Sequence, residues 1–170
     1  KSKVLGLKKL TYADRGVSIG KLKKKVSFEE SYKILLDVFT RVDPNFGEIL
    51  QKFVENGQID AFSKIGKAGG AYNAHDHGSP GFVLLNHNDT LDSLQTFAHE
   101  MGHATHSEFS KSQSVFYDSY SMAAAETAST LFECFLFYDQ FEKMPDEEKV
   151  IALHDKIQDD VQTIFRQVAC

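Results

Sequence analysis

The stretch Thr96–Ser107, TFAHEMGHATHS, lies near the middle of the chain and decides how the rest of the sequence is interpreted. It contains the motif H-E-x-x-H, with His99 and His103 four residues apart and Glu100 between them. Four residues along a helix correspond to about 40° of rotation and about 6 Å of rise, so both imidazoles can reach one metal ion. Glu100 lies about 100° around the helix from His99, beside such an ion rather than on it. The motif predicts a zinc-activated water with Glu100 as the general base of a hydrolase.

A catalytic zinc usually has three protein ligands and an open position, so a third ligand is needed. His106 shares a face with His99 but lies about 10.5 Å further along the helix, too far for one coordination sphere. Glu108 is turned away from the face of His99 and His103. The longer pattern H-E-x-x-H-x-x-G-x-x-H is excluded because His106 stands where that pattern has glycine.

Glu126 is the favoured third ligand. It lies in the small-residue stretch MAAAETAST, where a lone buried carboxylate would be costly unless a cation compensated its charge. Glu133, two turns further on the same face, could accept a hydrogen bond from a ligand imidazole and fix its tautomer. The sequence therefore predicts one Zn²⁺ per chain, held by His99, His103 and Glu126.

Length and composition predict one domain over residues 1–170, because 170 residues with 42% hydrophobic content can bury one sizeable core. The net charge of −5 gives no electrostatic footprint for nucleic acid, and the basic run KLKKK is interpreted as a solvated loop. Two cysteines cannot form a disulfide framework, and no apolar run is long enough for a membrane helix. We expect a cytoplasmic protein with no membrane and no nucleic-acid partner.

Periodicity and capping signals predict a mainly α fold with a small β-sheet (α+β). The helix over 28–42 begins with a capping box formed by Ser27 and Glu30. An almost encircling apolar pattern predicts a buried helix over 122–143, and the stripe of the last helix predicts packing on the others. The remaining predicted elements are a helix over 44–56, strands over 71–73 and 82–86, a helix from Asp89 or Thr90 to Ser110, and a last helix with a stripe at Val150, Ile157, Val161, Ile164 and Val168.

The segment GGAYN, residues 69–73, is suited to hold a peptide substrate. An exposed strand edge can bind an extended peptide through main-chain hydrogen bonds, and Gly70, Ala71 and Tyr72 would supply this edge. The same segment could instead be an ordinary hairpin strand. His75 and His77 are interpreted as loop histidines rather than a second metal site, and the role of His87 stays open.

Several blocks of sequence together resemble one known family. They are GKAGGAY, FVLLN, TFAHEMGHATHS, AAETASTLFE and FRQVA, in this order from Gly66 to Ala169. The chain resembles the catalytic segment of oligoendopeptidase F, in the thimet-oligopeptidase-like group of zinc metallopeptidases. The order and spacing of five blocks make this resemblance far more specific than the H-E-x-x-H motif.

The resemblance implies a zincin-like catalytic domain of the oligopeptidase or neurolysin type, with a deep channel for short oligopeptides. It implies that His99, His103 and Glu126 are zinc ligands and that Glu100 is the general base or acid. His106 matches the additional histidine of the family pattern H-E-x-G-H-x-x-H, beside the ligands or on the substrate side. The implied activity is that of a metalloendopeptidase that cleaves oligopeptides in the cytoplasm.

Family members are considerably longer, so residues 1–170 are expected to be part of the catalytic domain of a longer enzyme. The tyrosine and histidine that stabilise the oxyanion in the family lie beyond the FRQVA block. The 170 residues alone are therefore expected to bind zinc but to hydrolyse peptides poorly. The alternatives are a catalytically inactive fragment or degenerate peptidase that binds peptides or metal, and a helical interaction domain without metal. The sequence leaves the oligomeric state open.

Overall fold

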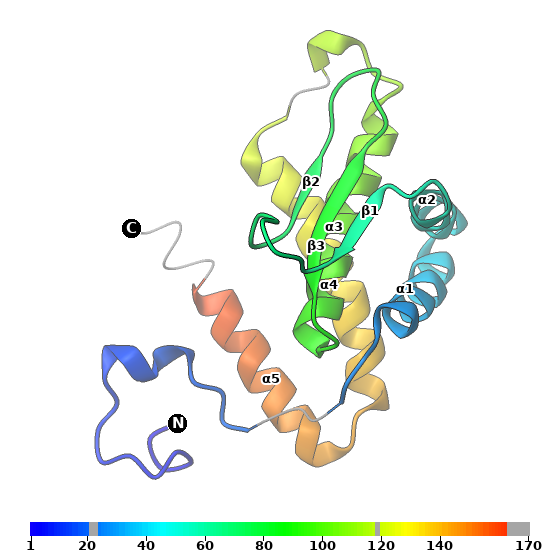
Figure 1. Cartoon of the computed structure of the whole chain (residues 1–170). Coiled ribbons are helices and arrows are strands. Elements are labelled where there is room, and N and C mark those ends of the chain that lie inside the picture. Colours follow the sequence, from blue (N-terminus) through cyan, green and yellow to red (C-terminus); the bar gives the residue numbers. More distant parts are fainter. Residues whose placement is uncertain (21–23, 118–119, 163–170) are drawn as a thin grey trace. The chain divides into compact units, whose positions relative to one another are not determined.

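The structure is a computed structural model that describes residues 1–20, 24–117 and 120–162. The chain divides into two compact units. Residues 24–140 form the larger unit, and the described parts of 1–23 and 141–170 form the smaller one. The predicted functional residues all lie in the larger unit, and Figure 1 shows its helices and strands.

Two helices open the larger unit. Helix α1, Phe28–Val42, begins as predicted with Ser27 and Glu30 in a reciprocal capping box. Helix α2, Pro44–Glu55, begins with Asp43 as N-cap and proline at its first position. Gly57 follows the end of α2 with a φ of +67°, a conformation that glycine adopts without a steric penalty. The apolar faces of both helices contribute Leu35, Phe39, Leu50 and Phe53 to the core.

A three-stranded sheet follows, in the order β1-β3-β2. Strands β2, Tyr72–Ala74, and β3, Phe82–His87, are antiparallel and coincide with the two predicted strands to within one residue at each end. Strand β1, Ile59–Phe62, pairs in parallel with β3 and was not predicted. Because β3 lies between the other two, one edge of β2 pairs with no other strand among the described residues.

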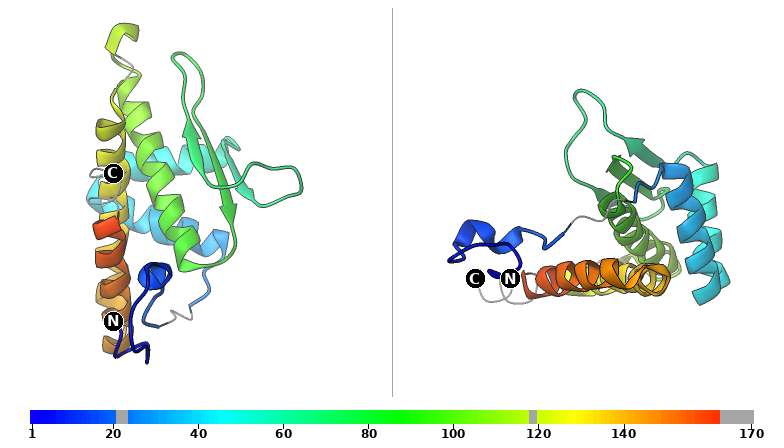
Figure 2. Two further views of the ribbon diagram at one scale, coloured as in Figure 1. Left: turned by 90° about the vertical axis from the view of Figure 1, so that its left-hand side faces the viewer. Right: turned by 90° about the horizontal axis from the view of Figure 1, so that it is seen from below.

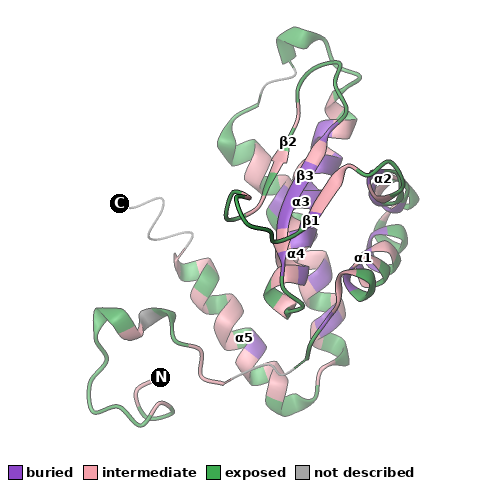
Figure 3. Cartoon of the chain, viewed as in Figure 1, coloured by how far each residue is buried: buried purple, intermediate pink, exposed green. Residues whose placement is uncertain are grey.

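Helix α3, Leu91–Ser110, contains the H-E-x-x-H motif and packs on β2 and β3. Thr90, one of the two predicted caps, accepts a hydrogen bond from the Ser93 main-chain N–H and is the N-cap. Phe97 and Met101 are completely buried between the sheet and the other helices. Figure 3 shows that buried residues concentrate along α3 and β3. The motif is thus carried by the most buried helix of the unit.

Helix α4, Met122–Lys143, has the bounds predicted from the sequence and follows the short 3-10 helix η2, Val115–Tyr117. The left view of Figure 2 shows its part in the larger unit next to α3, and Gly102 of α3 lies close to the main chain of Ser129 in α4. The prediction that this helix is buried all round is wrong. One face packs inward through Ser129, Phe132 and Leu136, whereas Leu131 and Tyr138 are exposed, because the described chain covers only one side of the helix.

The smaller unit contains the 3-10 helix η1, Tyr12–Gly16, and helix α5, Asp146–Val161. Within it, the Ser18 hydroxyl donates to the Asp155 carboxylate at 2.7 Å. Among the described residues of α5, Ala152 is buried, whereas Val150, Ile157 and Val161 of the predicted stripe are exposed. Packing of this stripe on the helices of the larger unit stays a prediction. Ile164, Val168 and the FRQVA block lie outside the described residues.

The predicted fold class, mainly α with a small sheet, is confirmed by these elements. In the described part of the chain, no helix is both long enough and apolar enough to cross a membrane.

Candidate metal centre

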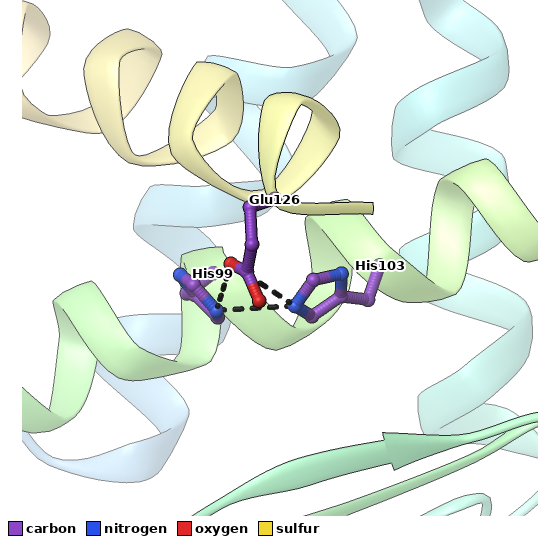
Figure 4. A group of neighbouring side chains, drawn as sticks. All are labelled: His99, His103 and Glu126. Atoms are coloured by element: carbon purple, nitrogen blue, oxygen red, sulfur yellow. Dashed lines mark hydrogen bonds and ion pairs between the residues drawn. The ribbon is translucent and has the colours of Figure 1, made fainter. Parts of the chain in front are cut away.

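The two motif histidines project from one face of α3. The Nε2 atoms of His99 and His103 lie 3.1 Å apart, and the ring planes are inclined at 83°. This arrangement follows from their spacing, because residues i and i+4 of a helix lie one above the other. The two Nε2 atoms therefore face one point in space (Figure 4).

Glu126 reaches the same point from α4. Its Oε2 atom lies 3.5 Å from His99 Nε2 and 3.8 Å from His103 Nε2. Ligand atoms at the corners of a tetrahedron around zinc, each about 2.0–2.1 Å from the ion, are separated by about 3.4 Å. The three donor atoms have nearly this separation. They form the one group of three or more potential metal ligands found among the described residues.

The surroundings of Glu126 differ from the prediction. Its side chain is 44% exposed rather than buried, because the first turn of α4 is covered on one side only. The Ser129 hydroxyl donates a hydrogen bond of 2.9 Å to Glu126 Oε2 and orients the carboxylate. Convergence with the two imidazoles, rather than the cost of burial, is therefore the feature that distinguishes Glu126 from other glutamates.

Glu133 lies two turns along α4, where its carboxylate accepts a hydrogen bond from His99 Nδ1. This bond assigns the proton of His99 to Nδ1 and leaves the lone pair on Nε2, facing His103 and Glu126. The side chain of Gln95 donates to the second Glu133 oxygen at 3.2 Å and holds it in place. The structure thus brings Glu133 against a proposed ligand, at the atom that does not face the cluster.

The two imidazoles differ in their affinity for protons. Burial lowers the pKa of His99, but the hydrogen bond and the charge of Glu133 outweigh it and leave the pKa above its usual value. Burial and the neighbouring His99 lower the pKa of His103. His103 therefore stays neutral over a wide pH range, which is the form that binds metal.

Glu100 is 5% exposed, although it is ionisable. Burial raises the pKa of its carboxyl group, an effect that the positive charge of His99 partly offsets. The main-chain N–H of Asn73 donates a hydrogen bond to the carboxylate. Within the described residues, the Oε2 atom is buried without a hydrogen-bond partner. Burial of a carboxylate oxygen without a hydrogen-bond partner costs folding free energy, so such an oxygen indicates a site where a water or a substrate group binds.

A cavity of about 740 Å³ connects these groups. It is bounded by β2 and the loop after it on one side and by α3 and the start of α4 on the other. Its lining includes the predicted substrate residues Ala71 and Tyr72, but Gly70 is not part of it. Gly70 adopts a φ of +78°, and its carbonyl oxygen accepts a hydrogen bond from the Asn86 side chain at 2.8 Å. Gly70 therefore shapes the turn into β2 rather than the wall of the cavity.

His106 is separate from the three-donor cluster. Its ring stacks on Tyr120 with centroids 4.2 Å apart, and within the described residues its Nδ1 atom is buried without a hydrogen-bond partner. Tyr120 also lines the cavity and was not singled out from the sequence. Its stacking contact depends on how the connection between α3 and α4 folds back, for which the sequence carries no local signal.

The other loop and strand histidines take two different positions. His75 and His77, interpreted as loop histidines, line the cavity from the β2–β3 loop. His87 is buried at the end of β3, where its Nε2 atom lies 3.0 Å from the Ser31 hydroxyl of α1. Burial lowers the pKa of His87. His87 therefore joins the sheet to α1, and it does not line this cavity.

A helix that carries H-E-x-x-H with both histidines on one face is the signature of the zincin class of metallopeptidases. The sequence pattern described as peptidase family M3 matches residues 20–169. The chain belongs to this family.

Named relatives and a solved structure agree with this assignment. The group B oligopeptidase PepB of Streptococcus agalactiae and an oligoendopeptidase F homolog of Lactococcus lactis are each 32% identical over 98% of this chain and 28% of their own length. The crystal structure of a candidate peptidase from Chlamydophila abortus superposes with a TM-score of 0.85 at 29% identity, covering 98% of this chain and 28% of that one. The chain thus spans 28% of the length of these relatives.

Proposed function

We propose that this chain carries the metal-binding and catalytic residues of a zinc-dependent endopeptidase that cleaves short oligopeptides. The observation that supports this most strongly is the convergence of His99, His103 and Glu126 beside a buried Glu100 with an unpartnered oxygen. The names of the relatives, oligopeptidase and oligoendopeptidase F homolog, support peptides as the substrate class. Their greater length supports residues 1–170 as part of a longer catalytic domain.

His99, His103 and Glu126 would hold the ion through two imidazole nitrogens and one carboxylate oxygen. This set of ligands suits zinc, and its separations match a tetrahedral site. Zinc bound there would supply a Lewis acid that lowers the pKa of water toward 7 and polarises the scissile carbonyl group. Glu133 would keep His99 in the tautomer that has its lone pair on Nε2.

Glu100 would act as the general base and then as the general acid. Burial raises the pKa of the Glu100 carboxyl group toward neutral pH. A group with a pKa near the working pH can both accept a proton and return it. It would accept a proton from the attacking water and pass it to the amine nitrogen when the peptide bond breaks. The Asn73 N–H binds the carboxylate, and the Oε2 atom is left for the water.

Strand β2 would hold the peptide by adding it as a further strand at its free edge. Ala71 and the half-exposed ring of Tyr72 line the cavity beside this edge. A peptide bound in extended form along β2 would pass Glu100 and the metal ligands, because α3 packs on the same strand.

The proposed ligand set is tested by zinc content and affinity. We expect one zinc per chain, and we expect the Glu126→Gln and His103→Gln variants to bind zinc far more weakly. Glu108→Gln is the matched control, since Glu108 lies on α3 but pairs with Lys111 away from the donor group. If the control lost as much zinc affinity as Glu126→Gln, the ligand assignment would be wrong.

The catalytic role is tested by hydrolysis of a quenched fluorescent oligopeptide by the natural protein that contains these residues. For the parent protein we expect hydrolysis that chelators abolish and zinc restores. The Glu100→Gln variant should retain zinc, but its kcat should fall at least about a hundredfold, which is the lower end of the range for general-base catalysis. A Glu100→Gln protein as active as its parent would refute the mechanism. A parent protein that binds zinc and peptides without cleaving them would support the degenerate peptidase instead.

A further inference from the structure

We propose that Asn73 and Ser107 are positioning residues for Glu100, and that Tyr120 anchors them to the segment before α4. The proposal rests on the proposed function in assigning Glu100 as the base, but its contacts are independent of any metal. A chain of hydrogen bonds joins these three residues, which come from β2, α3 and the connection after η2.

The direction of each hydrogen bond in the chain is fixed by its partners. The Asn73 Nδ2 atom donates to the Phe82 carbonyl oxygen at 3.2 Å, so the Oδ1 atom of the same amide points the other way. Ser107 Oγ, 3.4 Å from this oxygen, must donate to it, because an amide oxygen only accepts. The Tyr120 hydroxyl, 3.1 Å from Ser107 Oγ, is then the donor to the serine. Each hydroxyl proton is donated once, the Ser107 hydroxyl both accepts and donates, and such chains strengthen their members cooperatively.

Burial gives these hydrogen bonds their importance. Ser107 is 2% exposed, so a lost partner would leave its hydroxyl unsatisfied in the interior. The side chain of Asn73 is held on both sides, by the neighbouring strand β3 and by α3. This fixes the main chain of β2 relative to α3 at residue 73.

The main-chain N–H of Asn73 is the group that binds the Glu100 carboxylate. The side-chain bond between Asn73 and Ser107 therefore sets where this donor lies, and the donor sets which way Glu100 faces. Seven residues, or about two turns, separate Glu100 from Ser107, so both lie on nearly the same face of α3, toward β2. The chain of hydrogen bonds thus acts on the base through the strand that is proposed to bind the peptide.

Amide hydrogen exchange tests the proposal without metal or substrate. In the metal-free protein we expect the Asn73 amide to be protected, and Ser107→Ala to accelerate its exchange about tenfold, the factor given by one hydrogen bond of typical net strength. The Val83 amide, which donates to the Gln58 carbonyl at 2.8 Å on the other side of β3, is the internal control and should be unchanged. Ser110→Ala is the matched variant, since among the described residues the Ser110 hydroxyl donates within its own helix, to the His106 carbonyl oxygen.

Kinetics in the natural zinc-loaded protein separate positioning from general stability. We expect Ser107→Ala and Asn73→Ala each to lower kcat about tenfold, with KM and zinc affinity within twofold of the parent. The double variant should resemble either single variant, because both substitutions break the same chain of hydrogen bonds. Equal acceleration at Asn73 and Val83, or a raised KM with unchanged kcat, would mean that the residues only stabilise the sheet, and the proposal would fall. If Glu100→Gln left hydrolysis intact while the exchange result held, the proposed function would fail and the positioning contact would stand.

Discussion

Replacement of Gly102 by alanine tests how closely the two helices of the candidate metal centre must approach. Gly102 belongs to the motif helix α3, and a Cβ atom at this position would lie 2.6 Å from Ser129 Cα, 2.9 Å from the Ala128 carbonyl oxygen and 3.1 Å from the Ser129 nitrogen. All three obstacles are main-chain atoms of α4, so no side-chain rotation can relieve the overlap. The helices would have to move apart, and Glu126 would move with α4.

The expected magnitude follows from two opposing contributions. Over-packing of a tight interior costs about 1–3 kcal/mol, and rigid main-chain obstacles place this site near the upper value. Alanine is better than glycine in a helix by about 1 kcal/mol, which offsets part of that cost. We expect Gly102→Ala to be less stable by about 2 kcal/mol, which lowers Tm by roughly 4–8 °C. Displacement of Glu126 should weaken zinc binding by at least about tenfold.

Thermal unfolding of the metal-free protein and a zinc competition titration measure the two effects separately. Gly69→Ala is the control, because nothing lies within 4 Å of its added Cβ and its φ is not in the left-handed region. Its free energy of unfolding should change by less than about 0.5 kcal/mol. A Gly102→Ala protein as stable as its parent, with the same zinc affinity, would refute the close helix contact and its role in carrying Glu126.

Three further predictions concern the groups around the centre. Glu133→Gln should weaken zinc binding about 10- to 100-fold without removing a ligand, measured by competition with a chromophoric chelator, and unchanged affinity would contradict its contact with His99. Because the pKa of His99 lies above its usual value, zinc affinity should begin to fall on acidification at a pH above about 6.5. A zinc affinity that stays unchanged down to that pH would exclude the raised pKa. Because burial lowers the pKa of His87, the unfolded state takes up the proton before the folded state does on acidification. The stabilising contribution of neutral His87 is therefore complete above about pH 6.5 and is lost as the pH falls through the folded-state pKa. Denaturant unfolding should show that the free energy of unfolding of His87→Gln depends less on pH than that of the parent, and an equal dependence would refute this.

Much of the helical fold could be predicted because its signals are local. The capping box at Ser27, proline after Asp43 and the Thr90 cap each lie within a few residues of the helix that they begin. Strand β1 was missed because it has four residues and is stabilised by pairing with β3, more than twenty residues later in the chain. The burial of α4 on all sides was predicted wrongly because an apolar pattern does not reveal whether the described chain supplies a surface to cover each face.

The residues of the candidate site also differ in whether a local sequence signal or a long-range contact places them. His99, Glu100 and His103 are found from one motif, because helical spacing alone decides where they point. Glu126 could be named from its sequence context, but the premise of a buried carboxylate was wrong, since the side chain is 44% exposed. Asn73, Ser107 and Tyr120 could not be found, because their contacts join three elements and none follows from spacing along the chain.

The central claim is that one zinc ion joins α3 to α4, and anomalous X-ray diffraction at the zinc edge tests it most directly. In crystals of the zinc-loaded protein we expect one anomalous peak per chain, with His99 Nε2, His103 Nε2 and a Glu126 carboxylate oxygen each about 2.0–2.2 Å away. A peak that lies beside the two histidines but remains distant from Glu126, or no peak at these residues, would contradict the account.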